Sequence, residues 1–223
     1  MCPSSSRLDR LRDRGHMLQQ SRAFFAEHGI LEVDCPILSH GASIDVHIDL
    51  IPARYGENET IFLHSSPEFG MKRLLAEGIG DIYQLSHVFR NEEMGPKHNP
   101  EFLMAEWYRV GFSFSQMIEE TVEFIRLFLG PLPLRCISYR ALFLQELGID
   151  YLSASCGDLA KYLSAQGISV YPNVMKEGKD ALCNLLLATC LEPLLGQGEL
   201  TVLMHYPASQ AALAKKIWIG DEE

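Results

Sequence analysis

Two alternating segments of the chain place the strongest limit on its fold. Residues 81–90 (DIYQLSHVFR) and 101–110 (EFLMAEWYRV) each alternate polar with apolar side chains, and about ten mostly polar residues separate them. Such alternation is typical of half-buried strands, and two such strands in succession predict an antiparallel hairpin. Most hairpin loops hold about two to five residues, and longer ones are usually functional or disordered. We therefore expect an antiparallel sheet with a long loop at one end.

The period of two predicts which side chains share a face of this hairpin. Its polar face is expected to carry Gln84, Ser86, Arg90, Glu106 and Tyr108. On this face Arg90 could bind phosphate oxygens, Glu106 could hold an ammonium group, and Phe102 offers an aromatic surface for a purine. The residues alone leave a second interpretation open, in which Arg90 and Glu106 form a cross-strand ion pair on a solvated face.

Composition excludes several classes of protein. With 223 residues, of which 47% are hydrophobic, the chain can bury a core as one domain, or as one domain with a small appendage. A formal net charge of −10 disfavours broad contact with tRNA or DNA, although a single phosphate site stays open. The six cysteines include no C-x-x-C pair, so neither a disulfide framework nor a structural zinc site is expected. The first 15 residues contain no apolar segment, which favours a cytoplasmic protein.

The rest of the sequence predicts helices interspersed with short strands. Residues 6–28 predict an amphipathic helix, and Ser66 is expected to cap a second helix over 66–78. A weak domain boundary is expected at 130–138. The apolar stripe of the first helix is expected at Leu8, Leu11, Leu18 and Phe25. Further helices are expected at 115–129, 139–147, 157–166 and 179–191, and further strands at 30–38, 45–51, 61–66 and 200–206.

Four segments of the chain resemble one family of enzymes. The segment 89–108 (FRNEEMGPKHNPEFLMAEWY) resembles motif 2 of the lysyl-specific class II aminoacyl-tRNA synthetases, and 30–38 (ILEVDCPIL) resembles their motif 1. The segment 64–78 (HSSPEFGMKRLLAEG) is similar to their amino-acid pocket. Together with 205–214 (HYPASQAALA), these details are most similar to the paralogous group of elongation factor P–(R)-β-lysine ligases. The resemblance implies an α+β fold, an antiparallel sheet flanked by helices, and a homodimer through motif 1.

The resemblance also implies roles for single residues. Arg90 would contact the α-phosphate of ATP as the catalytic residue, and Phe102 would stack on adenine. Lys97 or His98 would reach the terminal phosphates, and Glu68 would hold a substrate ammonium. The residues expected to bind ATP are Arg90, Asn91, Glu92, Lys97, His98, Asn99 and Phe102. The residues expected to bind the amino acid are Ser66, Pro67, Glu68, Glu106 and Tyr108.

The chemistry implied by the resemblance needs no enzyme nucleophile. The carboxylate of (R)-β-lysine attacks the α-phosphorus of ATP, pyrophosphate leaves, and a lysine amine of elongation factor P then attacks the acyl-adenylate. Orientation and charge stabilisation are what the protein must supply. The loop 91–100 is expected to be mobile when empty and ordered by triphosphate, with a permanently ordered surface loop as the alternative.

Two departures from the family pattern set further expectations. No anticodon-binding domain precedes the motif 1 segment, so tRNA is not expected as a partner. A glycine-rich motif 3 is absent, so residues 1–223 are expected to be a catalytic core truncated before that motif. The ligands for Mg²⁺ are expected in the missing C-terminal part, and no metal ligand is assigned within the chain. A lysyl-tRNA synthetase core fragment and a non-catalytic dimerising pseudoenzyme remain as alternatives.

Overall fold

The computed structural model describes residues 6–41, 48–92, 94–96 and 98–218. The chain divides into two compact units, Met1–Phe128 and Leu129–Glu223. The division lies directly before the segment 130–138, where the sequence predicts a weak boundary. No helix in the described ranges is both long enough and apolar enough to cross a membrane.

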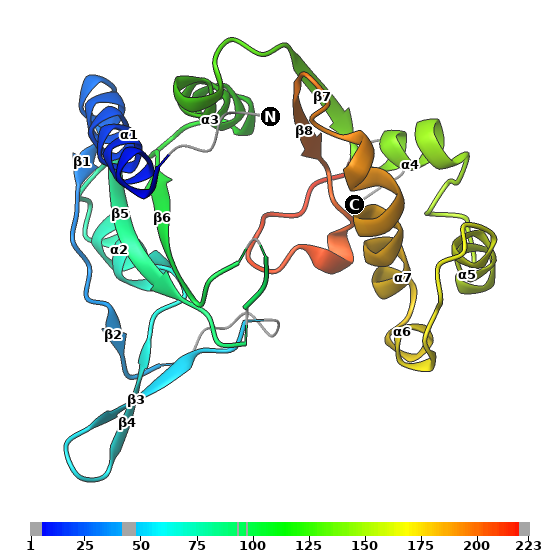
Figure 1. Ribbon diagram of the computed structural model, residues 1–223, viewed down its shortest axis with the longest axis horizontal. Helices are drawn as coiled ribbons and strands as arrows, with labels where there is room; N and C mark the ends of the chain where they lie inside the picture. The colour runs from blue at the N-terminus through cyan, green and yellow to red at the C-terminus, as the bar shows by residue number, and fades with distance from the viewer. Residues whose placement is uncertain (1–5, 42–47, 93, 97, 219–223) are drawn as a thin grey trace. The chain divides into compact units, whose positions relative to one another are not determined.

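A three-stranded sheet forms the centre of the first unit (Figure 1). Its strands, in the order β1-β5-β6, are β1 (Leu31–Glu32), β5 (Ile82–Phe89) and β6 (Glu101–Tyr108). Strands β5 and β6 pair in antiparallel fashion, with Gln84 opposite Glu106 and Val88 opposite Phe102. Strand β1 runs parallel to β5. The predicted hairpin is therefore confirmed, and the fold is of the expected α+β class.

A second, antiparallel sheet of the first unit has the order β2-β4-β3. Its strands are β2 (Leu38–Ser39), β3 (Ile51–Tyr55) and β4 (Glu59–Leu63). The strand predicted over 30–38 is wrong as a single element, because an irregular segment over residues 33–37, which contains Pro36, separates β1 from β2. Of the strand predicted over 45–51, residues 45–47 lie outside the described residues, and pairing begins only at Ile51.

Helices α1 (Arg7–Glu27) and α3 (Phe114–Leu129) supply the core on one face of the first sheet. Ser6 and Asp9 form a reciprocal capping box at the start of α1, which explains where the helix begins. The predicted apolar stripe is wrong in its first half, because Leu8 is 63% exposed and Leu11 is 54% exposed. The buried cluster on this face comprises Phe24, Phe25, Ile30 and Tyr83, with Leu85, Trp107 and Phe124 packed against it.

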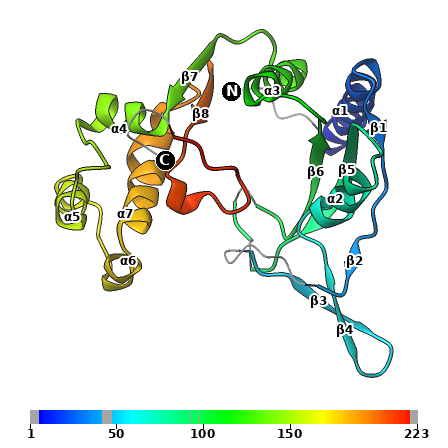
Figure 2. The same ribbon diagram turned by 180° about the vertical axis from the view of Figure 1, so that it is seen from behind.

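Helix α2 (Glu68–Ala76) covers part of the opposite face of this sheet (Figure 2). Its Met71 packs with Ile82 of β5 and with Cys35 from the segment between β1 and β2. Gly70 allows this close approach, since a Cβ atom there would lie 2.7 Å from the Cβ atom of Cys35. The first turn of α2, which carries Glu68, is therefore held against the floor of the sheet.

A buried ion network ties the end of β6 to α3. Arg109 lies 3.2 Å from a carboxylate oxygen of Glu120 and 3.1 Å from one of Asp81. The indole Nε1 of Trp107 donates to the other oxygen of Glu120 at 2.8 Å. Because the side chains of Arg109 and Glu120 are 10% and 5% exposed, each charge depends on its partner.

The second unit packs helices around a short parallel strand pair. Strand β7 (Leu134–Ser138) pairs with β8 (Leu200–Met204), and β7 was not expected from the sequence. A short helix at Pro172–Glu177 (α6) was also missed. The other helices are α4 (Tyr139–Leu147), α5 (Cys156–Ala165) and α7 (Lys179–Leu186), the last continuing as a π-helical turn over Leu187–Leu191. The core of this unit includes Tyr139, Leu142, Phe143, Leu159, Leu163, Leu182 and Leu186.

Candidate functional site

A carboxylate at the centre of the hairpin floor is oriented by two hydroxyl groups. The Oγ atom of Ser66 donates to Oε2 of Glu106 at 2.5 Å, and the phenol of Tyr108 donates to Oε1 at 2.8 Å. Ser66 also accepts the backbone N–H of Glu68 at 3.0 Å, which satisfies an otherwise free donor at the start of α2. The prediction that Ser66 is the helix cap is wrong in position, because Pro67 is the N-cap of α2. The hydroxyl of Ser66, one residue earlier, instead accepts the first N–H of the helix and clamps Glu106.

Tyr108 stays a neutral hydrogen-bond donor in this arrangement. Burial raises its pKa well above the ordinary value, and the hydrogen bond to Glu106 and the charges of Glu106 and Glu68 raise it further. An ionised phenolate beside two carboxylates would be strongly disfavoured. The phenol proton is therefore available to hold Glu106 at any physiological pH.

Glu68 is placed beside this clamp but has a cation of its own. Its Oε1 atom lies 2.5 Å from Nζ of Lys72, one helical turn further along α2. The side chain of Glu68 is 33% exposed. Two carboxylates, Glu68 and Glu106, thus lie near Tyr108, as expected for a site that holds a positively charged amine.

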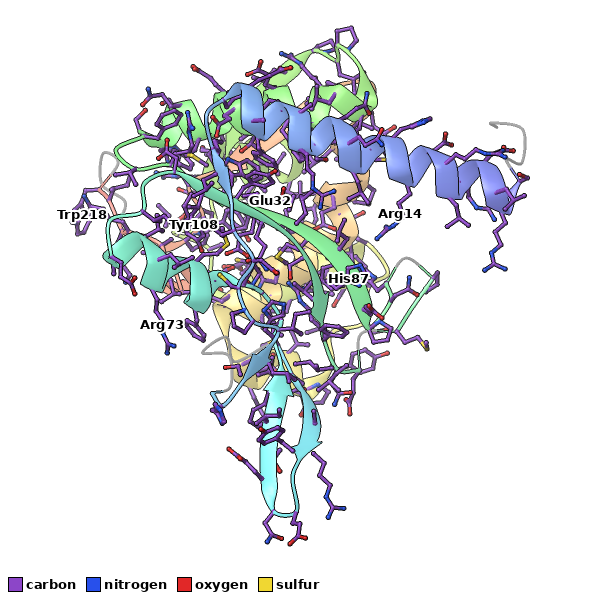
Figure 3. The ribbon with its side chains drawn as sticks, turned by 90° about the vertical axis from the view of Figure 1, so that its left-hand side faces the viewer. Arg14, Glu32, Arg73, His87, Tyr108 and Trp218 are labelled. Carbon is purple, nitrogen blue, oxygen red and sulfur yellow. The ribbon has the colours of Figure 1, made fainter. Side chains whose placement is uncertain are left out.

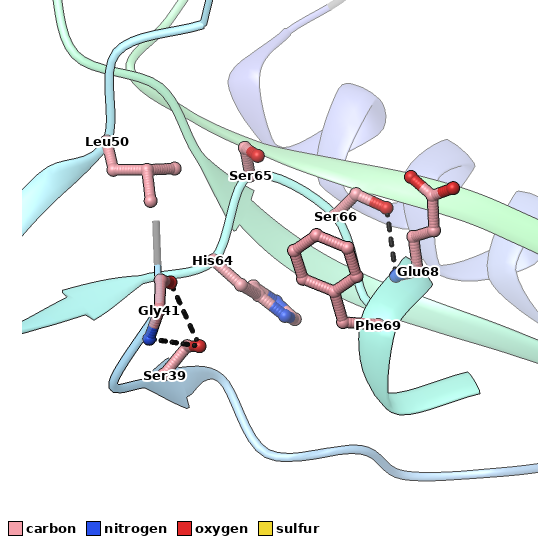
Figure 4. A pocket seen from close by; sticks show the side chains of 8 residues that line it. All are labelled: Ser39, Gly41, Leu50, His64, Ser65, Ser66, Glu68 and Phe69. Atoms are coloured by element: carbon pink, nitrogen blue, oxygen red, sulfur yellow. Dashed lines mark hydrogen bonds between the residues drawn. The ribbon is translucent and has the colours of Figure 1, made fainter. Parts of the chain in front are cut away.

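A small pocket opens beside these residues between β2, β4 and α2 (Figure 4). The pocket is partly open to solvent, and its volume of about 30 Å³ is enough to hold a water molecule but little more. A ligand of amino-acid size would therefore extend out of it. The residues that line it are Ser39, Gly41, Leu50, His64, Ser65, Ser66, Glu68 and Phe69.

His64 is a pocket residue that the sequence analysis missed. Its Nε2 atom lies 2.9 Å from the backbone oxygen of His87 and 3.2 Å from Oγ of Ser86. Its backbone oxygen accepts the N–H of Phe89 at 3.0 Å. His64 therefore connects the pocket to the end of β5, where Arg90 follows. The signal that could have found it is its place directly before the Ser65–Ser66 pair.

Gln84, expected on the polar floor, has a structural role instead. Its Oε1 atom accepts the backbone N–H of Cys35 at 2.9 Å, and its amide donates to the oxygen of the same residue at 3.4 Å. Gln84 is 3% exposed. The amide thus fixes the irregular segment after β1 and is not free for a ligand.

The far end of the hairpin presents the arginine predicted to bind phosphate. The guanidinium carbon of Arg90 lies 5.1 Å from the ring centroid of Phe102, within the range of a cation–π contact. The pairing of β5 with β6 excludes the other interpretation of the sequence, in which Arg90 and Glu106 form an ion pair. Glu106 lies opposite Gln84, six residues before Arg90, and six residues of strand span about 20 Å.

The loop after Arg90 folds back on itself. Gly95 and His98 exchange backbone hydrogen bonds of 3.1 and 3.2 Å, which closes a tight turn. Glu92 adopts a positive φ of 60°, a conformation that non-glycine residues rarely adopt. The structure thus brings Arg90 and Phe102 into contact, and it places Asn91, Glu92, His98 and Asn99 in the exposed loop. The predicted ATP ligand Lys97 lies outside the described residues.

The amino-acid set is brought together at the other end of the hairpin. Pro67 is the last residue before α2, and its backbone oxygen accepts the N–H of Met71 at 3.0 Å. Ser66, Glu106 and Tyr108 are directly hydrogen-bonded, and Glu68 contacts Ser66 through its backbone. No group of three or more His, Cys, Asp or Glu side chains in the described ranges is arranged to hold a metal ion.

Comparison with known proteins bears on this geometry. Residues 3–132 match the family of tRNA synthetases class II (D, K and N). The chain is 41% identical over 207 residues to the elongation factor P–(R)-β-lysine ligase of Mannheimia succiniciproducens, covering 91% of this chain and 63% of that protein. It is 39% identical over 218 residues to the ligase of the same name from Vibrio vulnificus, covering 96% and 67%.

The relative of the same name from Pasteurella multocida is 37% identical over 218 residues, covering 96% of this chain and 66% of that protein. The chain thus spans about two thirds of the length of these curated relatives. The family match includes the whole hairpin, the pocket and the start of α2, which are the parts that carry the candidate site. The chain therefore belongs to the class II tRNA synthetase family (D, K and N).

Proposed function

We propose that this protein is an ATP-dependent ligase that adenylates (R)-β-lysine and transfers it to a lysine of elongation factor P. The observation that carries the proposal is the arrangement of the hairpin. One end has two carboxylates beside a hydroxyl clamp, and the other end has an arginine over an aromatic ring. The relatives named as elongation factor P–(R)-β-lysine ligases support this choice of substrates.

In the proposed first step, the substrate lies along the floor between these two ends. Glu68 binds a substrate ammonium, while Glu106 is kept in place by hydrogen bonds from Tyr108 and from the pocket residue Ser66. The substrate carboxylate then attacks the α-phosphorus of ATP, and pyrophosphate departs. Arg90 stabilises the negative charge that grows on the α-phosphate, because a guanidinium keeps its charge and presents paired donors.

Phe102 is assigned to the adenine, in keeping with its place directly beside Arg90. The loop residues Asn91, Glu92, His98 and Asn99, together with Lys97, are assigned to the nucleotide. Mg²⁺ bound with ATP would neutralise phosphate charge during the reaction. In the second step, the target amine attacks the carbonyl carbon of the adenylate, and AMP leaves as the amide bond forms.

The proposal extends to assembly and location. Leu31 of β1, in the motif 1 segment, and Leu8 and Leu11 near the start of α1 are exposed apolar side chains. Such groups favour association with a second surface, so a homodimer through this region is part of the proposal. Modification of a translation factor would take place in the cytoplasm.

The test of the first step is the exchange of labelled pyrophosphate into ATP, which reports reversible adenylate formation. The proposal predicts exchange that requires (R)-β-lysine and is absent in Glu68→Gln at the same substrate concentration. Exchange that depends on no amino acid, or binding of ATP without any exchange, would contradict it. Exchange with lysine followed by charging of tRNA would favour the lysyl-tRNA synthetase alternative.

A further inference from the structure

The carboxylate assigned to the substrate already has an ammonium partner inside the protein. Helix α2 places Glu68 and Lys72 four residues apart on one side, with Nζ and Oε1 separated by 2.5 Å. Both side chains are partly exposed, at 33% for Glu68 and 44% for Lys72. The neighbouring Arg73 projects from α2 away from Tyr108 (Figure 3).

The second carboxylate of the site, Glu106, lies next to the pocket residue Ser66 and has both oxygens engaged. Glu106 accepts one hydrogen bond from Ser66 and one from Tyr108. These donors are neutral and hold the carboxylate without cancelling its charge. Glu68, in contrast, has a side-chain partner on one oxygen, and that partner is a cation of the same kind as a substrate amine.

We propose that Lys72 is a specificity-determining residue. Its ammonium acts as an internal counter-ion of Glu68, so the substrate ammonium must either displace Lys72 from Glu68 or share the Glu68 carboxylate with Lys72. This inference rests on the proposed function, because it requires that Glu68 binds the substrate. Lys72 neutralises Glu68 in the empty site and so avoids an unpaired carboxylate beside Glu106. It also lowers the attraction of the pocket for any amine.

The strength of the pair makes such displacement feasible. A partly exposed ion pair at this helical spacing shifts an equilibrium by only about a factor of two. A cation held within several ångströms of the bound ammonium repels it more strongly than that. Removal of the Lys72 charge should therefore strengthen substrate binding, although Lys72 touches no atom assigned to the nucleotide.

The experiment is calorimetric titration of the 223-residue chain with (R)-β-lysine and, separately, with ATP. The variants are Lys72→Met, Glu68→Gln, their double mutant, and Arg73→Met as the matched control. Methionine keeps the length of the side chain and its helix propensity. Arg73→Met removes a neighbouring positive charge from the same helix without touching Glu68.

We expect Lys72→Met to lower the Kd for (R)-β-lysine about three- to tenfold at low salt, with less gain at high salt. The Kd for ATP should stay unchanged, and Arg73→Met should alter neither Kd by more than about twofold. The gain should vanish in the double mutant, because Lys72 acts through Glu68. A Kd in Lys72→Met that equals or exceeds that of the original chain would overturn the inference while leaving the proposed function intact. If neither the original chain nor Lys72→Met binds (R)-β-lysine although both are folded, the proposed function and the inference are overturned together.

Discussion

Substitution of Gly70 by alanine tests how tightly α2 is held against the floor of the site. A Cβ atom at this position would lie 2.7 Å from Cβ and 2.9 Å from Sγ of Cys35. The favourable separation of two carbon atoms is about 3.5–4.0 Å, so α2 or the Cys35 segment must move by roughly 1 Å. Overpacking of this kind costs about 1–3 kcal/mol, while alanine in a helix gains about 1 kcal/mol over glycine. A net destabilisation of up to about 2 kcal/mol is expected.

The matched control is Gly15→Ala in α1, where an added Cβ atom would meet nothing within 4 Å. This variant should be more stable than the original chain by about 0.5–1 kcal/mol. The assay is urea denaturation of both variants, followed by fluorescence, with equal slopes required for the comparison. Equal stabilisation by the two alanines would show that Cys35 does not restrict the position of α2 at Gly70.

Three further changes test other parts of the structure. Arg90→Ala should raise the activation free energy of pyrophosphate exchange by about 3 kcal/mol and so slow the exchange. An unchanged rate would show that Arg90 does not contact the α-phosphate. Glu120→Ala should lower the free energy of unfolding by about 1–3 kcal/mol, since it removes one of the two carboxylates beside the buried Arg109 and leaves the indole N–H of Trp107 without its acceptor. Denaturant titration measures this, and an unchanged free energy of unfolding would contradict it. The hydrogen-bonded guanidinium of Arg140 lowers the pKa of Asp150 below its ordinary value of 3.8. The Arg140–Asp150 pair therefore stabilises the folded protein above pH 3.8, and this contribution is lost as the pH falls through the lowered pKa. Asp150→Asn should therefore reduce stability at pH 7 and flatten the acid side of the pH–stability curve, and an identical curve would count against the pair.

Local patterns in the sequence predicted the elements that depend on neighbouring residues. The alternation at 81–90 and 101–110 was sufficient for the hairpin and its faces, because side-chain direction in a strand follows directly from the period of two. The prediction of a hydrogen-bonding role for Ser66 at the start of α2 was nearly right for the same reason, since its hydroxyl accepts an N–H only two residues away, although Pro67 is the N-cap. The amino-acid set met as expected because two of its members share a strand face.

Features that depend on distant partners could not be predicted in this way. Strand β7 pairs with a strand more than sixty residues later, and nothing in its own five residues indicates that partner. The exposure of Leu8 and Leu11 follows from where α1 meets the sheet, which the helical period does not encode. The Glu68–Lys72 pair was not predicted, and its role depends on the neighbouring Glu106 clamp, which comes from a distant strand.

In the proposed reaction, this site joins a lysine-like amino acid to a protein amine. The most direct measurement is the intact mass of elongation factor P after incubation with this protein, ATP and (R)-β-lysine. We expect an increase of one β-lysyl group on a single lysine, which requires ATP and is lost with Arg90→Ala. An unchanged mass of the factor under conditions in which the protein binds both ATP and (R)-β-lysine would contradict it.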